Sequence, residues 1–289
     1  MILEETYELS NGVRIPKLGF GTWLIDGEAA TQATERAIAC GYRLIDTAQA
    51  YGNEAEVGRA VRNSGVARDK VFVASKIAAD LKTKDAAAKS IDESLSKMGL
   101  DYLDLMIIHS PQPWADFRNT DDHFYEGNLE AWAALEDAYD AGKLRAIGVS
   151  NFLHDDVKSI QDNARIQPMV NQMLCHVGHV PQELIDYCKQ SNILVEGYSP
   201  IAHGEAHRLQ GVQAIADKYG VSVAQLCIRF LTQLDIVLLP KATSEAHIRA
   251  NVDVDFEISD DDMKALLAVQ PLSDYGEQNF FPVFDKAQS

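Results

Sequence analysis

Eight short apolar runs alternate with longer amphipathic stretches along this chain, and this alternation constrains the fold more than any other feature. A run of this length is typical of a buried strand, and the stretches between runs are long enough to hold a helix. Parallel strands need helix-sized connections, and eight strands linked in this way close into a (β/α)8 TIM barrel. We therefore predict an α/β protein built on this barrel. The runs are residues 18–21, 43–46, 71–75, 103–108, 145–149, 169–172, 193–198 and 236–240.

Two of the intervening stretches show helical periodicity plainly. Between Asp85 and Met98, and again between Leu129 and Ala141, apolar residues recur every three or four positions, so each helix has one face to lay on a sheet. Trp132 belongs to such a stripe, and we expect it in the core. Glycine readily takes the left-handed conformation that ends a helix. The glycines that follow helical stretches are Gly41, Gly99, Gly142 and Gly220.

An open, doubly wound sheet is the alternative to a barrel. Its dinucleotide-binding members carry a GxGxxG motif after a strand. Here Gly19-Phe20-Gly21 continues to Leu24 where a third glycine would be needed, and no GxxxxGK[ST] motif occurs. The absence of both motifs favours the barrel.

The N-terminal residues predict a β-hairpin. The pair Asn11-Gly12 stands between two segments of alternating apolar residues, which is a strong hairpin signal, and Pro16 ends the second segment. The length of 289 residues is close to the roughly 250 usual for such a barrel. We expect a single domain over residues 1–289, with the hairpin at residues 1–16 and a C-terminal loop at residues 271–289.

The net charge excludes several classes of partner. A charge of −17 repels nucleic acid and anionic lipid, and no basic run offsets it locally. Residues 1–5 lack the basic start and apolar core of a signal peptide, and no apolar run approaches the roughly 18 residues of a membrane span. We expect a cytoplasmic protein that binds neither nucleic acid nor membrane.

The cysteines and histidines carry no metal signature, and we expect no metal. The cysteines show no CxxC spacing and lie within or beside apolar segments, as reduced buried thiols commonly do. They are Cys40, Cys175, Cys188 and Cys227. His176 and His179, and likewise His203 and His207, have spacings that a metal could use, but neither pair has a partner in an HExxH or CxxC pattern.

Polar side chains end several of the apolar runs. Asp46, Lys76 and His109 each stand at the end of a different run, and Tyr51 follows Asp46 by five residues. In a TIM barrel the functional groups come from the C-terminal ends of different strands, so we expect these four side chains at one rim. Other polar or aromatic residues that end runs are Thr22, Trp23, Ser150, Asn151, Gln172, Tyr198, Ser199 and Lys241.

The four side chains at the rim have the chemistry to protonate a carbonyl oxygen. A phenol has a pKa near 10, and each unit of reduction requires about 1.4 kcal/mol of preferential stabilisation of the phenolate. Lys76 would supply that stabilisation to Tyr51, and Asp46 would keep Lys76 charged. His109, if neutral, would orient a substrate carbonyl by one hydrogen bond. Singly, each group has a plainer interpretation as a solvated charge, a loop anchor or a core histidine, but the combination indicates carbonyl reduction.

The motifs around these residues resemble the aldo-keto reductase superfamily over essentially the whole chain. They are Leu18–Trp23, Gly41–Ala48 running on to Tyr51–Glu54, Ser75-Lys76, Ile108–Pro111, Gly148–Phe152 and Tyr198–Ile201. The bacterial members that look similar reduce keto sugars, keto acids and small aldehydes, 2,5-diketogluconate reductases among them. The resemblance implies that NADPH gives a hydride to an aldehyde or ketone while Tyr51 supplies the proton. It also implies a monomer, since the family's barrels are often monomeric.

The resemblance further implies which residues bind the cofactor. Ser150, Asn151 and Gln172 match positions that hold the nicotinamide carboxamide, and Tyr198 matches the aromatic residue that stacks on the ring. The remaining predicted cofactor contacts are Thr22, Asp46, Ser199, Pro200, Ile201, Lys241, Thr243, His247 and Asn251.

The segment after the eighth run departs from the family pattern. A lysine, a serine and an arginine usually grip the 2′-phosphate of NADPH there; Lys241 is present, but Ala242 replaces the serine and His247 the arginine. A largely neutral imidazole cannot make the two parallel hydrogen bonds of a guanidinium, which implies a selectivity loss of about 1 to 3 kcal/mol. We expect NADH to be usable beside NADPH. The alternative is that Lys241 with Thr243 and Ser244 suffices for NADPH selectivity.

Substrate contacts follow from the same resemblance. The predicted ones are Trp23, Tyr51, His109 and Trp114. Residues 116–126 and 271–289 either cover the substrate pocket or pack passively on the barrel wall. The particular carbonyl substrate is not decided by one sequence.

Two alternatives to a reductase stay open. The family includes channel subunits and lens proteins, so a cofactor-binding regulatory or structural protein is one alternative. The complete set around Tyr51 argues against it, because binding alone does not require those residues. An enzyme that works in the direction of alcohol oxidation is the other, since the same residues would catalyse the reverse reaction.

Overall fold

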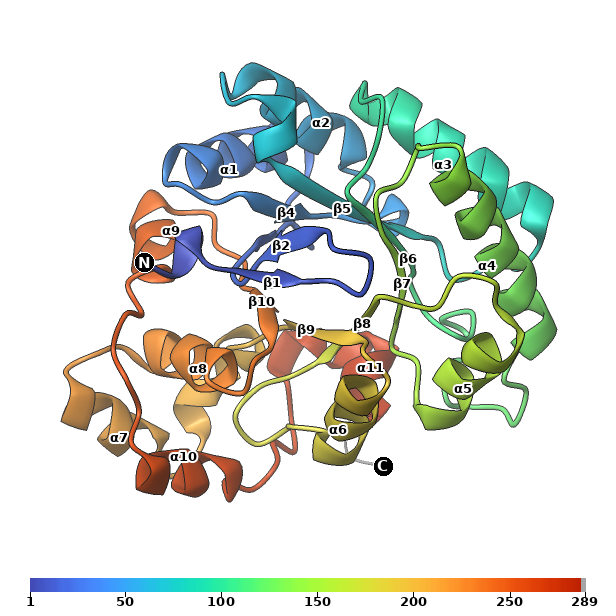
Figure 1. Cartoon of the computed structure of the whole chain (residues 1–289). Helices are drawn as coiled ribbons and strands as arrows, with labels where there is room; N and C mark the ends of the chain where they lie inside the picture. Colours follow the sequence, from blue (N-terminus) through green and yellow to red (C-terminus); the bar gives the residue numbers. More distant parts are fainter. Residues whose placement is uncertain (287–289) are drawn as a thin grey trace.

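Eight parallel strands close into a barrel in the computed structural model, which describes residues 1–286 (Figure 1). The strands are β3 (Phe20–Gly21), β4 (Leu44–Asp46), β5 (Phe72–Ile77), β6 (Leu105–Ile108), β7 (Ile147–Ser150), β8 (Val170–Leu174), β9 (Leu194–Tyr198) and β10 (Val237–Leu239). Each strand pairs with the next one in the sequence. Hydrogen bonds from Gly19 N to Leu238 O (2.7 Å) and from Gly21 N to Pro240 O (3.1 Å) join the last strand to the first. The predicted (β/α)8 barrel is therefore confirmed.

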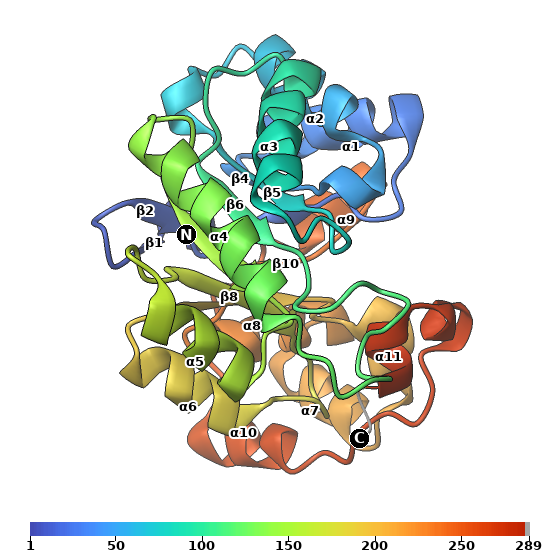
Figure 2. The ribbon, with the colours of Figure 1, turned by 90° about the vertical axis from the view of Figure 1, so that its right-hand side faces the viewer.

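Helices surround the strands on the outside of the barrel (Figures 1 and 2). They are α1 (Gly27–Ala39), α2 (Glu54–Asn63), α3 (Lys84–Met98), α4 (Tyr125–Asp140), α5 (His154–Asn163), α6 (Gln182–Gln190), α7 (Val212–Tyr219), α8 (Val223–Thr232), α9 (Glu245–Ala250) and α10 (Asp260–Leu267). A last short helix, α11 (Pro282–Lys286), lies at one end of the barrel instead (Figure 2). The helix ends follow local chemistry. The Ser222 hydroxyl caps α8 by accepting from the Gln225 N–H, and Gly99 ends α3 with a φ of 61°. Within residues 1–286, no helix combines the length and the apolar character that a membrane crossing requires.

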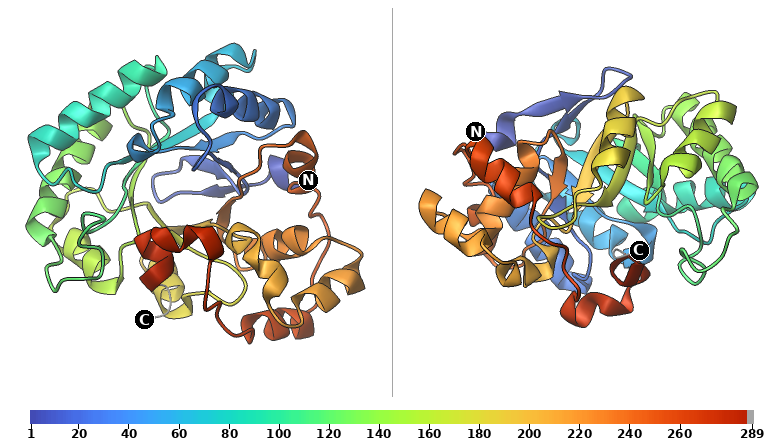
Figure 3. Two further views of the ribbon diagram at one scale, coloured as in Figure 1. Left: turned by 180° about the vertical axis from the view of Figure 1, so that it is seen from behind. Right: turned by 90° about the horizontal axis from the view of Figure 1, so that it is seen from below.

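The predicted hairpin lies at the end of the barrel where the strands begin. β1 (Thr6–Glu8) pairs antiparallel with β2 (Arg14–Pro16), and Asn11 donates to the carbonyl of Arg145 (2.9 Å) just before β7. Figures 2 and 3 show the hairpin and α11 at opposite ends of the barrel. The C-terminal ends of the strands therefore lie at the same end of the barrel as α11 (Figures 2 and 3).

The core is packed closely enough to require glycine at particular positions. A Cβ atom on Gly19 would lie 2.5 Å from Cγ of Leu44 and 2.8 Å from Cδ2 of Leu239. A larger residue there would push neighbouring strands apart, because protein interiors leave no such space. Trp132 is buried as predicted, and its indole N–H donates to the carbonyl of Ile166 (3.0 Å).

Candidate active site

A cavity of about 550 Å³ opens at the C-terminal ends of the strands. This volume is typical of small-molecule sites, and this end of a TIM barrel is where active sites lie. The lining combines residues at strand ends with residues of the C-terminal segment. They are Gly21, Trp23, Leu24, Asp46, Ala50, Tyr51, His109, Trp114, Ser150, Asn151, Gln172, Tyr198, Ser199, Pro200, Ile201, His203, Gly204, Leu239, Lys241, Gln278, Phe280, Phe281 and Phe284.

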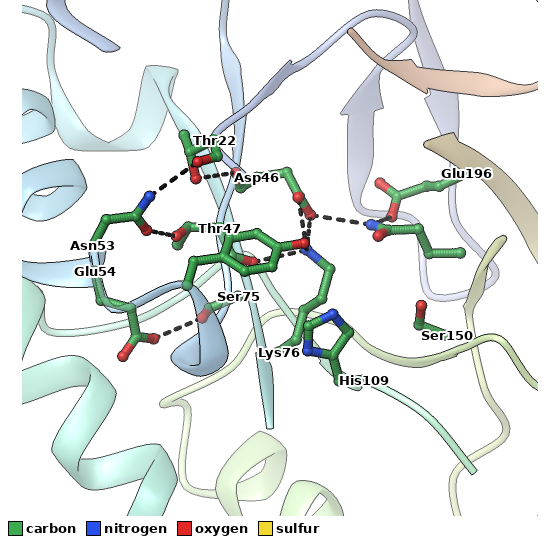
Figure 4. Close-up of polar contacts among 12 residues, drawn as sticks. Thr22, Asp46, Thr47, Asn53, Glu54, Ser75, Lys76, His109, Ser150 and Glu196 are labelled. Atoms are coloured by element: carbon green, nitrogen blue, oxygen red, sulfur yellow. Dashed lines mark hydrogen bonds and ion pairs between the residues drawn. The ribbon is translucent and has the colours of Figure 1, made fainter. Parts of the chain in front are cut away.

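A buried ion pair meets a phenol beside this cavity (Figure 4). Nζ of Lys76 lies 2.7 and 2.6 Å from the two carboxylate oxygens of Asp46, and 3.3 Å from the hydroxyl of Tyr51. Lys76 also donates to the carbonyl of Thr47 (2.8 Å) and is only 1% exposed. Because β4 and β5 are adjacent parallel strands, their C-terminal ends deliver the carboxylate and the ammonium to the same place. The ion pair therefore holds the Lys76 ammonium in contact with the Tyr51 hydroxyl.

Burial and charge set the protonation states of this group. Burial raises the pKa of Tyr51 above its ordinary value, and the ammonium of Lys76 opposes that rise. Burial alone would lower the pKa of Lys76, but the charge of Asp46 and the contact with Tyr51 outweigh it and raise that pKa. At neutral pH the phenol is therefore protonated and the lysine is charged, which suits Tyr51 to give a proton and Lys76 to stabilise the phenolate as it forms.

His109 faces the same phenol from the end of β6. Its ring centroid lies 5.6 Å from that of Tyr51 and 5.2 Å from that of Trp114. Burial, with a further contribution from the charge of Lys76, holds the pKa of His109 well below its ordinary value. The imidazole is therefore neutral at neutral pH and has one N–H to donate.

A buried hydrogen-bond network supports the loop that carries Tyr51 (Figure 4). The amide of Asn53 donates to the carbonyl of Thr22 (3.0 Å), and Oε1 of Glu54 accepts from the hydroxyl of Ser75 (2.7 Å). Both contacts cross from this loop to neighbouring strand ends. They hold the phenol in place through groups that are themselves buried.

The residues predicted to hold the nicotinamide form one wall of the cavity. They are Ser150, Asn151, Gln172 and Tyr198. Both ends of the Asn151 amide are engaged within the wall: the nitrogen donates to the carbonyl of His109 (3.0 Å), and the oxygen accepts from the hydroxyl of Tyr198 (2.6 Å). The Gln172 nitrogen donates to Asp46 (3.0 Å) and to Glu196 (2.9 Å). Sequence reasoning missed Glu196, although a carboxyl group inside an apolar strand was a signal for it.

The predicted phosphate contacts divide into those in the cavity and those beyond it. Ser199, Pro200, Ile201 and Lys241 line the cavity. Thr243, His247 and Asn251 do not, and lie on or beside α9. Thr22 is buried, and its hydroxyl donates to the carbonyl of Asp46 (2.9 Å).

Two arginines near α9 bear on the 2′-phosphate prediction. Arg249 is paired with Glu245 of the same helix at 2.8 Å. Arg36 of α1 donates to the carbonyl of Thr243 (3.1 Å). No sequence pattern points to Arg36, because it is 207 residues from Thr243 in the chain.

Aromatic rings from the C-terminal segment lie over the mouth of the cavity. The ring of Phe281 is 5.3 Å from Trp23 and 4.7 Å from Trp114, measured between centroids. Behind them, the hydroxyl of Tyr275 donates to Nε2 of His176 (2.8 Å), whose Nδ1–H donates to a backbone carbonyl. The C-terminal segment therefore lines the cavity rather than packing away from it.

The two segments expected as loops differ from each other. The C-terminal one contains a 3₁₀ turn (Gly276–Phe280) and α11, and its last residues, 287–289, lie outside the described residues. None of residues 116–126 lines the cavity; Phe117 instead packs behind Trp114 at 5.4 Å. Of residues 116–126 and 271–286, only the second segment contributes side chains to the cavity lining.

The histidines and cysteines considered in the sequence as possible metal ligands have the following surroundings. In residues 1–286 no group of three or more His, Cys, Asp or Glu side chains is placed to hold a metal ion. His203 lines the cavity with Nε2 3.0 Å from the hydroxyl of Ser199, and its ring contacts Trp23 at 5.3 Å. Burial raises the pKa of Cys188 to about 11 and that of Cys227 to about 12, so both thiols are protonated at neutral pH.

The fold and this site place the chain in a known family. Residues 17–270 match the model of the aldo/keto reductase family, and the chain belongs to that family. Glyoxal reductase of Bacillus subtilis is 38% identical over 269 residues, which cover 92% of this chain and 93% of that protein. Morphine 6-dehydrogenase of Pseudomonas putida is 36% identical over 89% of this chain and 88% of that protein.

Solved structures agree with this assignment. An aldo-keto reductase from a deep-sea metagenome library has a TM-score of 0.84 at 36% identity, covering 91% of this chain and 94% of the other. A Bombyx mori aldo-keto reductase in complex with NADP has a TM-score of 0.83 at 30% identity, covering 97% and 98%. The superfamily resemblance is confirmed, while the particular similarity to 2,5-diketogluconate reductases stays a prediction.

Proposed function

We propose that this protein is an NADPH-dependent reductase of small aldehydes and ketones, with Tyr51 as its proton donor. The observation that carries the proposal is the position of Lys76, whose ammonium contacts both the Asp46 carboxylate and the Tyr51 hydroxyl beside the cavity. Burying an ion pair costs desolvation energy. A protein that only bound a dinucleotide would have no use for such a pair next to a phenol, which argues against the regulatory or structural alternative.

The cavity has groups that suit a nicotinamide dinucleotide. At one wall the Gln172 nitrogen is engaged by carboxyl groups, which leaves its amide oxygen for a carboxamide N–H. Lys241 lines the cavity, and burial lowers its pKa because nothing nearby compensates its charge. A cofactor phosphate would provide that compensation. When bound, NADPH supplies the hydride.

The chain's own residues supply the proton and the orientation. Tyr51 donates its proton to the substrate oxygen, and Lys76 stabilises the phenolate that results. Asp46 keeps Lys76 in place. The neutral imidazole of His109 donates a hydrogen bond to the same substrate oxygen, which orients the carbonyl for hydride transfer.

The cavity mouth favours uncharged substrates. Trp23, Trp114 and Phe281 surround it, and Lys241 is the one Lys or Arg among the lining residues that the structure describes. In this proposal Lys241 pairs with the cofactor phosphates, so no lining Lys or Arg remains to pair with a substrate carboxylate. We expect methylglyoxal and phenylglyoxal to be better substrates than keto acids, in line with the glyoxal reductase among the relatives.

NADH should serve beside NADPH. His247 stands where the family has an arginine, and Arg249 is already paired with Glu245. The guanidinium of Arg36 is close to Thr243 and offers NADPH some compensation. The 2′-phosphate therefore adds less affinity than a free arginine at position 247 would provide.

Steady-state oxidation of each cofactor, followed at 340 nm, tests the proposal. The substrates are methylglyoxal, phenylglyoxal, a keto acid, xylose and 2,5-diketogluconate, and the corresponding alcohols test the reverse direction. Turnover of the glyoxals with both cofactors is the expected result. Binding of NADPH without turnover of any carbonyl or alcohol would favour the regulatory alternative.

A further inference from the structure

Glu196 is a buried carboxyl group whose part in the steps above is limited to its contact with the Gln172 nitrogen. It lies in the middle of β9 with no exposed surface, in register with Gln172 of β8 and Val237 of β10. Its Oε2 accepts from the Gln172 nitrogen at 2.9 Å, and its Oε1 has no hydrogen-bond partner among the described residues. Burying a carboxyl group with one oxygen unsatisfied costs stability, so its presence beside the site needs a reason.

Glu196 and Asp46 together determine which way the Gln172 amide points. The amide nitrogen of Gln172 donates to Glu196 and also to Oδ1 of Asp46 at 3.0 Å. The opposite orientation would place the amide oxygen against the Asp46 carboxylate, which is paired with Lys76. Both carboxyl groups therefore accept hydrogen bonds from the amide nitrogen of Gln172. The amide oxygen remains free to accept a hydrogen bond from a ligand in the cavity that Gln172 lines.

Glu196 is also connected to Tyr51 through a chain of polar contacts. The Gln172 nitrogen bridges Glu196 to Asp46, and Asp46 is paired with the ammonium of Lys76 that contacts the Tyr51 hydroxyl. The charged groups that face it are Asp46 of β4 and Lys76 of β5; its sheet neighbours Gln172 and Val237 carry no charge. Burial, with a contribution from the charge of Asp46, raises the pKa of Glu196 to about 7, against the opposing effects of the Gln172 hydrogen bond and Lys76. A carboxyl group with this pKa changes its charge near neutral pH.

We propose that Glu196 is a positioning residue for carbonyl reduction, which fixes the Gln172 amide toward the cofactor and slows proton donation by Tyr51 when it is ionised. The inference rests on the proposed function. The first effect follows from the shared amide nitrogen. The second follows from electrostatics, since an added negative charge near Asp46 and Lys76 disfavours the phenolate that forms as Tyr51 gives up its proton.

Two substitutions separate the effects. Glu196→Gln keeps an oxygen that accepts from Gln172 but cannot ionise, whereas Glu196→Leu removes both the acceptor and the charge. Glu136→Gln is the matched control, because Glu136 is a largely buried carboxyl on α4 that accepts from the backbone of Ile166 (2.7 Å), outside the cavity lining. Thermal unfolding of each variant first establishes that it folds.

The pH dependence of kcat tests the electrostatic effect. Between pH 5.5 and 8.5 we expect kcat for methylglyoxal reduction by the unmodified protein to fall about three- to tenfold, with a midpoint near 7. Glu196→Gln should remove this step, and Glu136→Gln should retain it. The same step in Glu196→Gln as in the unmodified protein would overturn this half of the proposal.

Cofactor binding, measured by quenching of tryptophan fluorescence, tests the orientation effect without turnover. We expect the Kd of NADPH to stay within about twofold for Glu196→Gln and to rise about tenfold for Glu196→Leu, as for one lost hydrogen bond in a buried site. An unchanged Kd in a folded Glu196→Leu would contradict the orientation effect; if that variant does not fold, a tenfold rise in Glu196→Gln would contradict it. Should no carbonyl turn over at all, the proposed function fails, and this binding measurement still decides the role of Glu196 toward the cofactor.

Discussion

Nζ of Lys76 lies 3.3 Å from the hydroxyl oxygen of Tyr51, in a site where that phenol is otherwise made less acidic by burial. Burial keeps the phenol protonated at neutral pH, and this single contact places a cation beside it, as the proposed role of Tyr51 as proton donor requires. The Asp46–Lys76 ion pair is buried, and this contact connects it to Tyr51, which lines the cavity.

Tyr51→Phe should abolish proton donation without disturbing the site around it. We expect kcat to fall by a hundredfold or more, while the Kd of NADPH changes by less than about twofold. Stopped-flow kinetics and fluorescence titration measure the two quantities. Tyr219→Phe is the matched control, since the Tyr219 hydroxyl bonds to Asp262 and Ser259 outside the cavity lining. Near-normal turnover in Tyr51→Phe would remove Tyr51 from its assigned role.

Lys76→Met should reduce stability as well as rate. It leaves the carboxylate of Asp46 buried without its cation, and the loss of one partner of a buried ion pair typically costs about 3 to 5 kcal/mol. Denaturant unfolding should show that decrease in the free energy of unfolding. The double variant Asp46→Asn with Lys76→Met should recover much of the stability but none of the activity. Equal stability of the single variant and the unmodified protein would mean that the pair is not desolvated as described.

His247→Arg should make the enzyme more selective for NADPH. A guanidinium at this position can pair with the 2′-phosphate, so we expect the ratio of kcat/KM for NADPH over NADH to rise about tenfold. Arg249→Met is the matched control, because Arg249 is already paired with Glu245, and the ratio should hardly change. A loss of thousands-fold on replacing NADPH by NADH in the unmodified protein would contradict the expectation of dual use.

Glu196 should make the folded protein less stable as the pH rises. Its pKa is raised from the ordinary 4.5 to about 7 on folding, so the folded state holds this proton more tightly than the unfolded chain does. The associated stability, about 3 kcal/mol, is fully present below pH 4.5 and is lost as the pH rises to about 7. The free energy of unfolding of Glu196→Gln, minus that of the unmodified protein, should increase over this range and then level off. A difference that does not vary with pH would show that Glu196 does not titrate there.

Local pattern alone determined most of the barrel. The eight strands, the hairpin and the glycine that ends α3 all depend on periodicity and backbone preference within a few residues, and these are visible in the sequence. The grouping of Asp46, Lys76 and His109 was also predictable, because the C-terminal ends of parallel strands meet at one rim of a barrel. Tyr51 could be added because it follows Asp46 on a short loop.

Tertiary structure alone decided what surrounds those residues. Gln172 contacts Asp46 across 126 positions of the chain, and Arg36 reaches Thr243 across 207. Likewise, the C-terminal segment brings Phe281 into the cavity lining, beside Trp23 and Trp114. Each of these contacts depends on how distant elements pack and on how much water they exclude. Burial also sets the charge state of Glu196 and of Tyr51, and burial is a property of the packed barrel rather than of the neighbouring residues in the chain.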